Sequence, residues 1–200
     1  KTPDQAKTRT GERVSVYFNG EFYDNVFARD RGAGTTRGAQ KFDFNRGFHC
    51  KISDEVGRVE EANLNSEGSD PTFIRPPLAY DTYRRAGNPA CEAFPVLMRA
   101  NGRTDRVANY VEQVDTLFVR RYGYNDQGVL YKFVQRGQIT PVFSDSTDGV
   151  EKKTFLNEPN TDLQQIVNAL KLPTAAQRQA FFFDKFNMPM FVNFLACRSL

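Results

Sequence analysis

The 200-residue chain has no tryptophan and very little histidine, cysteine or methionine. Its one histidine, His49, and its three cysteines, Cys50, Cys91 and Cys197, show no CxxC spacing. This set argues against a standard zinc site, which needs about four such ligands. A single imidazole also leaves few acid–base schemes open, so we interpret His49 as a strand residue without a catalytic role.

Long hydrophobic runs and a strong charge of one sign are also missing. The most apolar stretch, residues 190–195, is interrupted by Asn193, which excludes a membrane span of about 18 residues. The 27 basic and 24 acidic residues leave a net charge of only +3, so general nucleic-acid binding gains little support. A hydrophobic content of 40% is enough for a folded core in a single domain, with or without two lobes.

Two Asn-Gly pairs predict β-hairpins in the first two thirds of the chain. Asn19-Gly20 and Asn101-Gly102 are each flanked by segments rich in Val, Tyr, Phe or other apolar residues. Asn-Gly suits the tight turn that matches the twist of two antiparallel strands. The predicted strand pairs are 13–18 with 22–28 and 93–100 with 106–111.

A glycine-rich segment followed by a short strand carries the first candidate site. Arg31-Gly-Ala-Gly-Thr-Thr-Arg-Gly38 combines flexible backbone, hydroxyl groups and two guanidinium groups, which suit anionic oxygens. It matches neither common phosphate-loop pattern and is a weak signal by itself. The strand 41–45 follows, with Phe42 and Phe44 on one face and Lys41 and Asp43 on the other.

Helical signals mark the middle and the last third. Asp70-Pro71 predicts the start of a helix that ends at Gly87, although Pro76-Pro77 requires either a kink or a later start. A short helix is expected at 115–121 and a strand at 128–134. From Thr161 the apolar spacing becomes helical, with helices at 161–170, 175–187 and after Pro189. The fold class is therefore α+β, with a sheet-rich part that precedes helices.

Several motifs in the middle of the chain resemble the CotH family of atypical, spore-coat-type protein kinases. They are Asn63-Leu-Asn-Ser66, Asp70-Pro-Thr-Phe-Ile-Arg75, Leu78-Ala-Tyr-Asp81, Arg84-Arg-Ala-Gly87, Val111-Glu-Gln-Val-Asp115 and Gly128-Val-Leu-Tyr-Lys132. Arg29-Asp-Arg-Gly-Ala-Gly34 and the lysine-containing strand resemble the family upstream. The motifs occur in the family's order, and the resemblance covers about residues 13–200.

The resemblance implies an atypical protein-kinase-like fold with a sheet-rich N-lobe and the first helices of a helical C-lobe. We expect a polar N-terminal tail over residues 1–12. A sheet-rich nucleotide-binding lobe is expected over 13–160, with one long helix at about 70–86. The start of the helical lobe is expected over 161–200.

The resemblance also assigns nucleotide-binding residues. Lys41 would meet the ATP phosphates with Arg31 and Arg37 beside it, and Arg75 is placed like the arginine of the family's DPxxxR motif. The backbone of Glu112 and Asp115 would border the adenine. Each residue has an alternative interpretation: Lys41 as a solvated strand residue, Arg75 as the partner of an acidic neighbour, and Glu112 as the cap of the helix near Asp115.

In the family, the helix that resembles 190–200 leads into the segment with the catalytic and magnesium-binding aspartates. We find no such segment here, so we expect a truncated chain that lacks catalytic residues and is inactive as a kinase alone. ATP and magnesium are the implied cofactors, with magnesium bound mainly by the missing portion. The phenylalanine-rich segment 181–200 is expected to pack on the continuation of the chain or on a partner chain.

The leading hypothesis is part of a kinase domain that transfers phosphate from ATP to Ser or Thr of surface or coat proteins. The alternative is a non-catalytic structural or adhesive surface module, because Arg103-Thr-Asp-Arg106 and Ala108 replace aromatic residues of the family. A third hypothesis is a surface domain that binds carbohydrate or a partner protein. The resemblance implies an extracellular or cell-surface location, where Cys50 and Cys91 would form a disulfide or remain buried thiols.

Overall fold

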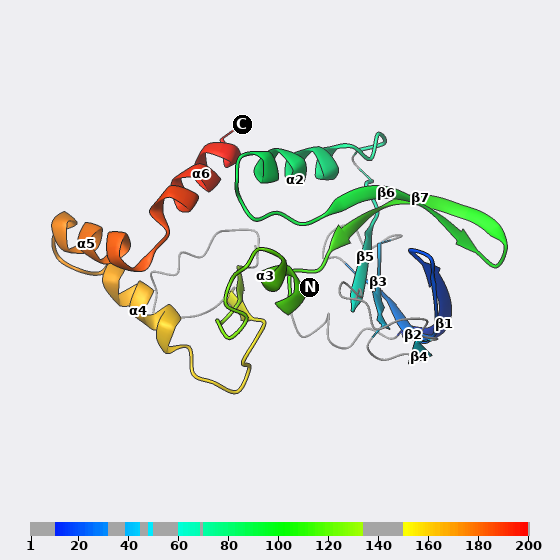
Figure 1. Cartoon of the computed structure of the whole chain (residues 1–200), viewed down its shortest axis with the longest axis horizontal. Coiled ribbons are helices and arrows are strands. Elements are labelled where there is room, and N and C mark those ends of the chain that lie inside the picture. Colours follow the sequence, from blue (N-terminus) through cyan, green and yellow to red (C-terminus); the bar gives the residue numbers. More distant parts are fainter. Residues whose placement is uncertain are drawn as a thin grey trace. The chain divides into compact units, whose positions relative to one another are not determined.

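The computed structural model describes residues 11–31, 39–44, 60–68, 70–133 and 150–199, together with the backbone of residues 48–49 (Figure 1). The chain forms two compact units. The first contains Pro89–Val114 and the chain before Ala86, and the second contains Ala86–Asn88 and the chain from Asp115 onward. The sequence placed the lobe boundary later, at 160. The difference arises because β8 (Tyr131–Phe133) pairs with β9 (Val150–Lys152) as a separate sheet and does not join the large sheet.

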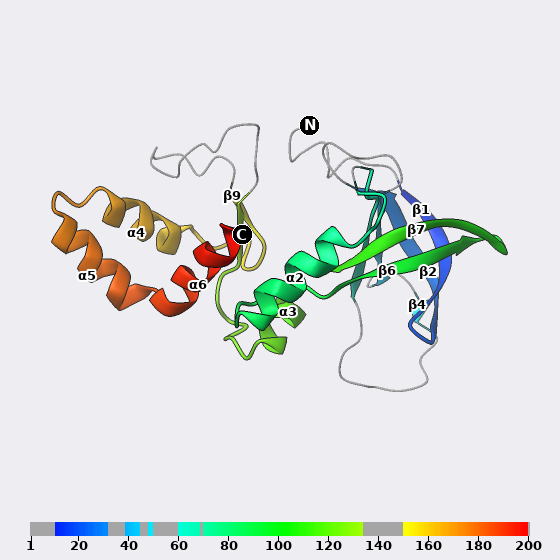
Figure 2. The same cartoon turned by 90° about the horizontal axis from the view of Figure 1, so that it is seen from above.

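The first unit is built on one curled antiparallel sheet with strand order β1-β2-β3-β5-β7-β6, to which β4 adds through β2. The strands are β1 (Gly11–Phe18), β2 (Glu21–Asp30), β3 (Gln40–Asp43), β4 (Phe48–His49), β5 (Glu61–Asn65), β6 (Ala93–Ala100) and β7 (Arg103–Glu112). Two views show β6 and β7 extending as a long hairpin beyond the other strands (Figures 1 and 2).

Both predicted hairpins are confirmed. Asn19 and Gly20 have φ angles of 51° and 86°, and Asn101 and Gly102 have 50° and 77°. Two consecutive positive φ angles define the turn that Asn-Gly favours, so the turn chemistry fixes the register of each hairpin. The β1–β2 pairing contains a bulge in β2, where Asp24 and Asn25 stand opposite the single residue Ser15 of β1, and Asn25 has a positive φ of 57°.

The two faces of this sheet differ sharply in polarity. Directly opposite residues share a face, so the register places Phe42, Ala62 and Tyr110 on one side. That side is the inner face of the curl and, with Tyr23, Val26 and Phe44, forms the hydrophobic core. The opposite face carries Lys41 and Asn63. The predicted alternation of phenylalanines against Lys41 and Asp43 is therefore confirmed.

Helix α2 (Arg75–Arg85) follows β5 and packs against β6. It begins later than the predicted 70–86, which corrects that start. Asp70 closes a turn by accepting hydrogen bonds from the backbone N–H groups of Thr72 and Arg75. Phe73 has a positive φ of 58°, which is incompatible with a continuous helix, so helical geometry starts only after this turn. Pro76 and Pro77 then occupy the first turn, where no intrahelical N–H is needed.

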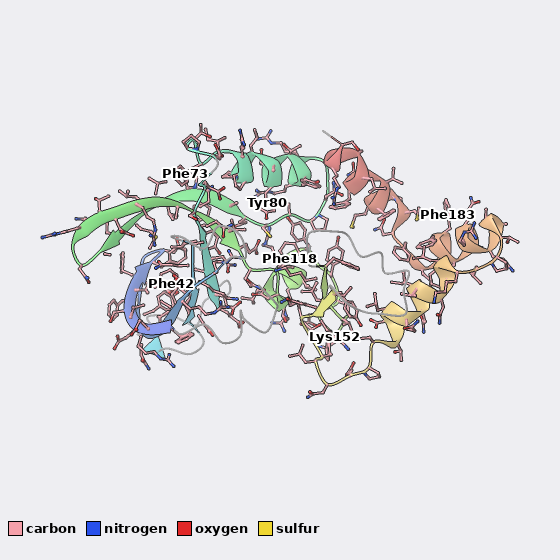
Figure 3. The ribbon with its side chains drawn as sticks, turned by 180° about the vertical axis from the view of Figure 1, so that it is seen from behind. Phe42, Phe73, Tyr80, Phe118, Lys152 and Phe183 are labelled. Atoms are coloured by element: carbon pink, nitrogen blue, oxygen red, sulfur yellow. The ribbon has the colours of Figure 1, made fainter. Side chains whose placement is uncertain are left out.

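The second unit contains the remaining helices and the small sheet. The helices are α3 (Thr116–Arg121), α4 (Thr161–Leu170), α5 (Ala175–Lys185) and α6 (Met188–Arg198). Helix α4 buries Leu163, Val167 and Ala169 and contacts α5, whereas neither α5 nor α6 has a buried residue. Figure 3 labels Phe183 on α5, where its side chain is 64% exposed.

Candidate nucleotide-binding site

The polar face of the first unit's sheet centres on Lys41. Its Nζ atom lies 2.6 Å from Oε2 of Glu61, and only 14% of the lysine side chain is exposed. Lys41 stands opposite Asn63 in the β3–β5 ladder, so Glu61 on the same face is its diagonal neighbour. The interpretation of Lys41 as a solvated strand residue is therefore wrong.

A chain of amide groups continues from Lys41 toward the end of β7. Gln113 Oε1 accepts a long hydrogen bond of 3.4 Å from Lys41 Nζ and a shorter one of 2.9 Å from Asn63 Nδ2. Asn63 Nδ2 also donates to the carbonyl of Val111 at 3.2 Å. Side chains on the polar face thus tie β3 and β7 to β5, the strand between them.

Arg31 supplies a second, partly buried cation just after the end of β2. Its guanidinium donates to Asn65 Oδ1 at 2.5 Å, and its backbone N–H donates to Ala39 O at 3.0 Å. These residues bracket the glycine-rich loop, whose residues 32–38, with Arg37, lie outside the described part of the chain. Tyr80 of α2, labelled in Figure 3, interacts electrostatically with Arg31.

Burial dominates the electrostatics of this face. Desolvation lowers the pKa of Lys41 from its ordinary value, while the hydrogen bond and charge of Glu61 oppose the change and nearby Arg29 and Arg31 add to it. Burial also lowers the pKa of Arg31. Two cations held in a partly dehydrated environment with one carboxylate favour a further anion, because each would regain lost electrostatic stabilisation.

The other predicted residues take different positions. Arg75 is exposed at the start of α2, where its backbone N–H and its charge stabilise the carboxylate of Asp70, an acidic neighbour as the alternative interpretation expects. Asp115 is the N-cap of α3, accepting from the N–H groups of Leu117 and Phe118.

Glu112 does not cap α3, so that alternative is wrong. Its Oε2 accepts instead from the backbone N–H of Glu92 at 2.9 Å, and its own N–H donates to Glu92 O, also at 2.9 Å. The predicted disulfide remains untested, because Cys50 lies outside the described residues. Cys91 is buried beside Tyr80.

Four residues of this face were missed by sequence reasoning: Glu61, Asn63, Asn65 and Gln113. The first three alternate with Ala62 and Leu64, which lie in the core, and strict alternation of this kind indicates a strand with one polar face. That signal was present in the sequence. The position of Gln113 beside Lys41 depends on long-range strand pairing and had no local signal.

The set of side chains suits an anionic ligand better than a metal ion. Lys41 and Arg31 offer positive charge, and the amides of Asn63 and Gln113 offer neutral hydrogen bonds. Over the described ranges, no group of three or more His, Cys, Asp or Glu side chains is placed to hold a metal ion. A phosphate group fits the cations, whereas magnesium would need carboxylates from elsewhere.

The fold and this face define an α+β protein with a candidate anion-binding sheet. A sequence model of the CotH kinase protein family matches residues 28–200, and the chain belongs to this family. A search among curated proteins found no match. In the part of the chain that the structure describes, no helix has the length and apolar character needed to cross a bilayer.

Proposed function

We propose that this chain is part of an ATP-dependent protein kinase domain that transfers phosphate to Ser or Thr of surface or coat proteins. The observation that carries the proposal is the partly buried Lys41, which pairs with Glu61 and has a second partly buried cation, Arg31, near it on the polar sheet face. A lysine on an N-lobe strand that pairs with a glutamate and meets nucleotide phosphates is a general part of protein kinases.

The topology of the first unit supports a kinase-like N-lobe. Lys41 lies on the third strand, and a helix, α2, precedes the final hairpin β6–β7 and packs on the same sheet. The segment after β7 leads from the first unit to the second. This is an argument from fold analogy, and the function rests on the chemistry of the polar face.

In the proposed complex, Lys41 and Arg31 contact the phosphates, with Arg37 and Arg75 as further candidates. The backbone of Glu112 and Asp115 borders the adenine. ATP with magnesium supplies the transferable phosphoryl group and the divalent charge. The residues of this chain bind and orient the nucleotide.

Thermal unfolding with nucleotide tests this proposal. Millimolar ATP with magnesium should raise the Tm of the intact chain, since a ligand that binds only the native state stabilises it. Lys41→Met should abolish the shift, whereas the matched control Lys185→Met removes a lysine that is 59% exposed and should keep it. A wild-type Tm that does not respond to ATP contradicts the proposal.

A non-catalytic surface module is the second candidate. It is favoured by the β6–β7 hairpin, where Arg103, Asp105 and Arg106 stand in place of aromatic residues of the family and Ala108 is fully buried in the core. Absence of a nucleotide-dependent Tm shift would support this module. In both cases we propose an extracellular or cell-surface location, with the Cys50–Cys91 disulfide as an accompanying proposal.

We also propose that further polypeptide covers the apolar surface of α5 and α6. Five side chains on these helices are 40–64% exposed: Phe183, Phe191, Val192, Phe194 and Leu195. Apolar surface of this extent on adjacent helices marks an interaction site more often than a solvent-facing surface. The continuation of the chain, or a partner chain with the catalytic carboxylates, would bury it.

A further inference from the structure

The carboxylate that pairs with Lys41 comes from the sheet and not from a helix. Glu61 is the first residue of β5, which pairs with β3 over residues 61–64. In protein kinases the equivalent glutamate is carried by a helix, and movement of that helix controls whether the ion pair forms. The origin of the carboxylate therefore decides how the lysine is controlled.

Helix α2 cannot supply this carboxylate. Asp81 is its one acidic residue, and Asp81 Oδ2 lies 2.6 Å from Arg85 Nε in an i,i+4 pair on the exposed side of the helix. The residue of α2 that interacts with the cationic face is Tyr80, through Arg31. The ion pair between Lys41 and Glu61 therefore contains no residue of α2.

A second group also contacts Lys41. Gln113 Oε1 accepts from Lys41 Nζ and from Asn63 Nδ2, and Asn63 is itself fixed to β7 through Val111 O. The lysine thus contacts both a carboxylate on β5 and an amide just after the end of β7. Asn63 is 2% exposed, so its amide has little freedom to move away.

We propose that Glu61 and Gln113 are the positioning residues of Lys41, so that the sheet holds this lysine ready for an anion and α2 exerts no control over it. The inference rests on the proposed function only for the role of Lys41 toward phosphate. The arrangement of the three side chains is a property of the first unit by itself, and its test does not require nucleotide.

The test follows the titration of Lys41 by NMR of its side-chain carbon next to Nζ, in the intact chain and with Lys41→Met for assignment. Glu61→Gln should lower the pKa of Lys41, because burial and the charges of Arg29 and Arg31 then act without the opposing carboxylate. Glu61→Asp keeps the charge and should retain most of the wild-type value. A merely structural role of Glu61 would not separate these two variants.

Moving the carboxylate provides a sharper form of the same test. Gln113→Glu in the Glu61→Gln background places a negative charge at the second position that contacts Lys41 and should raise the pKa of Lys41 again. Two changes on α2 serve as controls: Asp81→Asn removes its one carboxylate, and Ala79→Gly weakens the helix at an exposed position. Neither control should change the titration of Lys41.

The outcomes separate this inference from the proposed function. The inference is overturned if Glu61→Gln leaves the titration of Lys41 unchanged, or if either α2 variant shifts it as much as Glu61→Gln does. If Lys41 titrates as stated while ATP with magnesium fails to raise the wild-type Tm, the positioning stands and nucleotide binding fails. Circular dichroism of each variant verifies that the sheet is retained.

Discussion

Two buried asparagines on the polar sheet face differ in how well their amides are satisfied. Asn63 Nδ2 donates two hydrogen bonds, to Val111 O and Gln113 Oε1. Asn109 is fully buried, and within the described part of the chain neither of its side-chain polar atoms has a hydrogen-bond partner. Asn109 therefore bears the desolvation of an amide without the compensating bonds.

This difference predicts opposite effects of the same substitution. Asn109→Leu should raise the free energy of unfolding by about 1 kcal/mol, since it removes an unsatisfied amide at similar volume. Asn63→Leu should lower the free energy of unfolding, because Gln113 and Val111 lose their donor. Urea unfolding of both variants measures the two changes. A loss of stability in Asn109→Leu would show that its amide has a partner and would contradict the prediction.

The contribution of Asp70 to the stability of the fold depends on pH. Hydrogen bonds from the Thr72 hydroxyl, from Arg75 N–H and from Thr72 N–H lower the pKa of Asp70, although burial opposes them. A carboxylate whose folded-state pKa is lowered contributes stability that is fully present above its unfolded-state pKa and lost as the pH falls through its folded-state pKa.

We therefore expect Asp70→Asn to lower the Tm at pH 7. The Tm difference between the wild type and the variant should become smaller below about pH 4, near the unfolded-state pKa of Asp. Thermal unfolding of the wild type and the variant between pH 3 and pH 7 measures this. Asp81→Asn, on the exposed side of α2, is the matched control. A difference between wild type and Asp70→Asn that stays constant over this pH range would be inconsistent with the lowered pKa.

At the scale of elements, local turn chemistry was predictable and helix starts were less so. The Asn-Gly turns at residues 19–20 and 101–102 need positive φ angles at both positions, which few other dipeptides tolerate, so both hairpins follow from the sequence. Asp70-Pro71 matches the sequence pattern of a helix N-terminus, although no helix starts there. The carboxylate does accept backbone N–H groups there, but Phe73 with its positive φ makes the segment a turn, and α2 starts at Arg75.

Helix α5 depends on its N-terminal cap more than a buried helix would. Thr174 accepts from Gln177 N–H while Gln177 Oε1 accepts from Thr174 N–H, which forms a capping box. Since α5 has no buried residue, packing contributes little to compensate for loss of the cap.

Thr174→Ala should therefore destabilise the second unit by about 1 kcal/mol, and Thr174→Ser should retain most of the stability. Amide hydrogen exchange over residues 175–185 measures the local effect, because both variants leave the rest of the unit unchanged. Equal protection of α5 in the wild type and in Thr174→Ala would contradict a stabilising role of the capping box.

At the scale of the whole molecule, the candidate site was predictable only where its signal was local. Lys41 followed from its alternation with Phe42 and Phe44 and from the resemblance to the family. Glu61 and Gln113 are 20 and 72 residues away from Lys41 and reach it only through the pairing of β3 with β5 and of β5 with β7. No single sequence window contains that information, because register is set by turns and by the core.

The boundary between the two units also depends on long-range packing and not on a local sequence signal. The helical spacing from Thr161 correctly predicted α4 and α5, yet the boundary lies at Val114 and Asp115, where β7 ends and α3 begins. Asp115 was expected to border adenine, and its side chain caps α3 at this boundary. A change of periodicity therefore locates helices, whereas a unit boundary depends on which elements pack together.

The exposed apolar surface of α5 and α6 leads to the last prediction. Burial of one large apolar side chain contributes about 1.5–3 kcal/mol, so several such side chains in water favour association. We expect the intact chain to bind a hydrophobic dye and to self-associate with increasing concentration in sedimentation velocity. Replacing Phe183, Val192 and Leu195 together by Gln should reduce both effects and leave the Tm nearly unchanged, because the three side chains are 64%, 58% and 45% exposed.

A matched control distinguishes this surface from general exposure of apolar groups. Leu78 and Leu97 in the first unit are 59% and 62% exposed, and their replacement by Gln should have little effect on dye binding or association. Leu78 and Leu97 lie on two separate elements of the first unit, whereas the five exposed side chains of the second unit lie on two successive helices. If the control variant reduces association as much as the α5–α6 variant does, the surface of these helices has no special role, and the proposal that further polypeptide covers it fails.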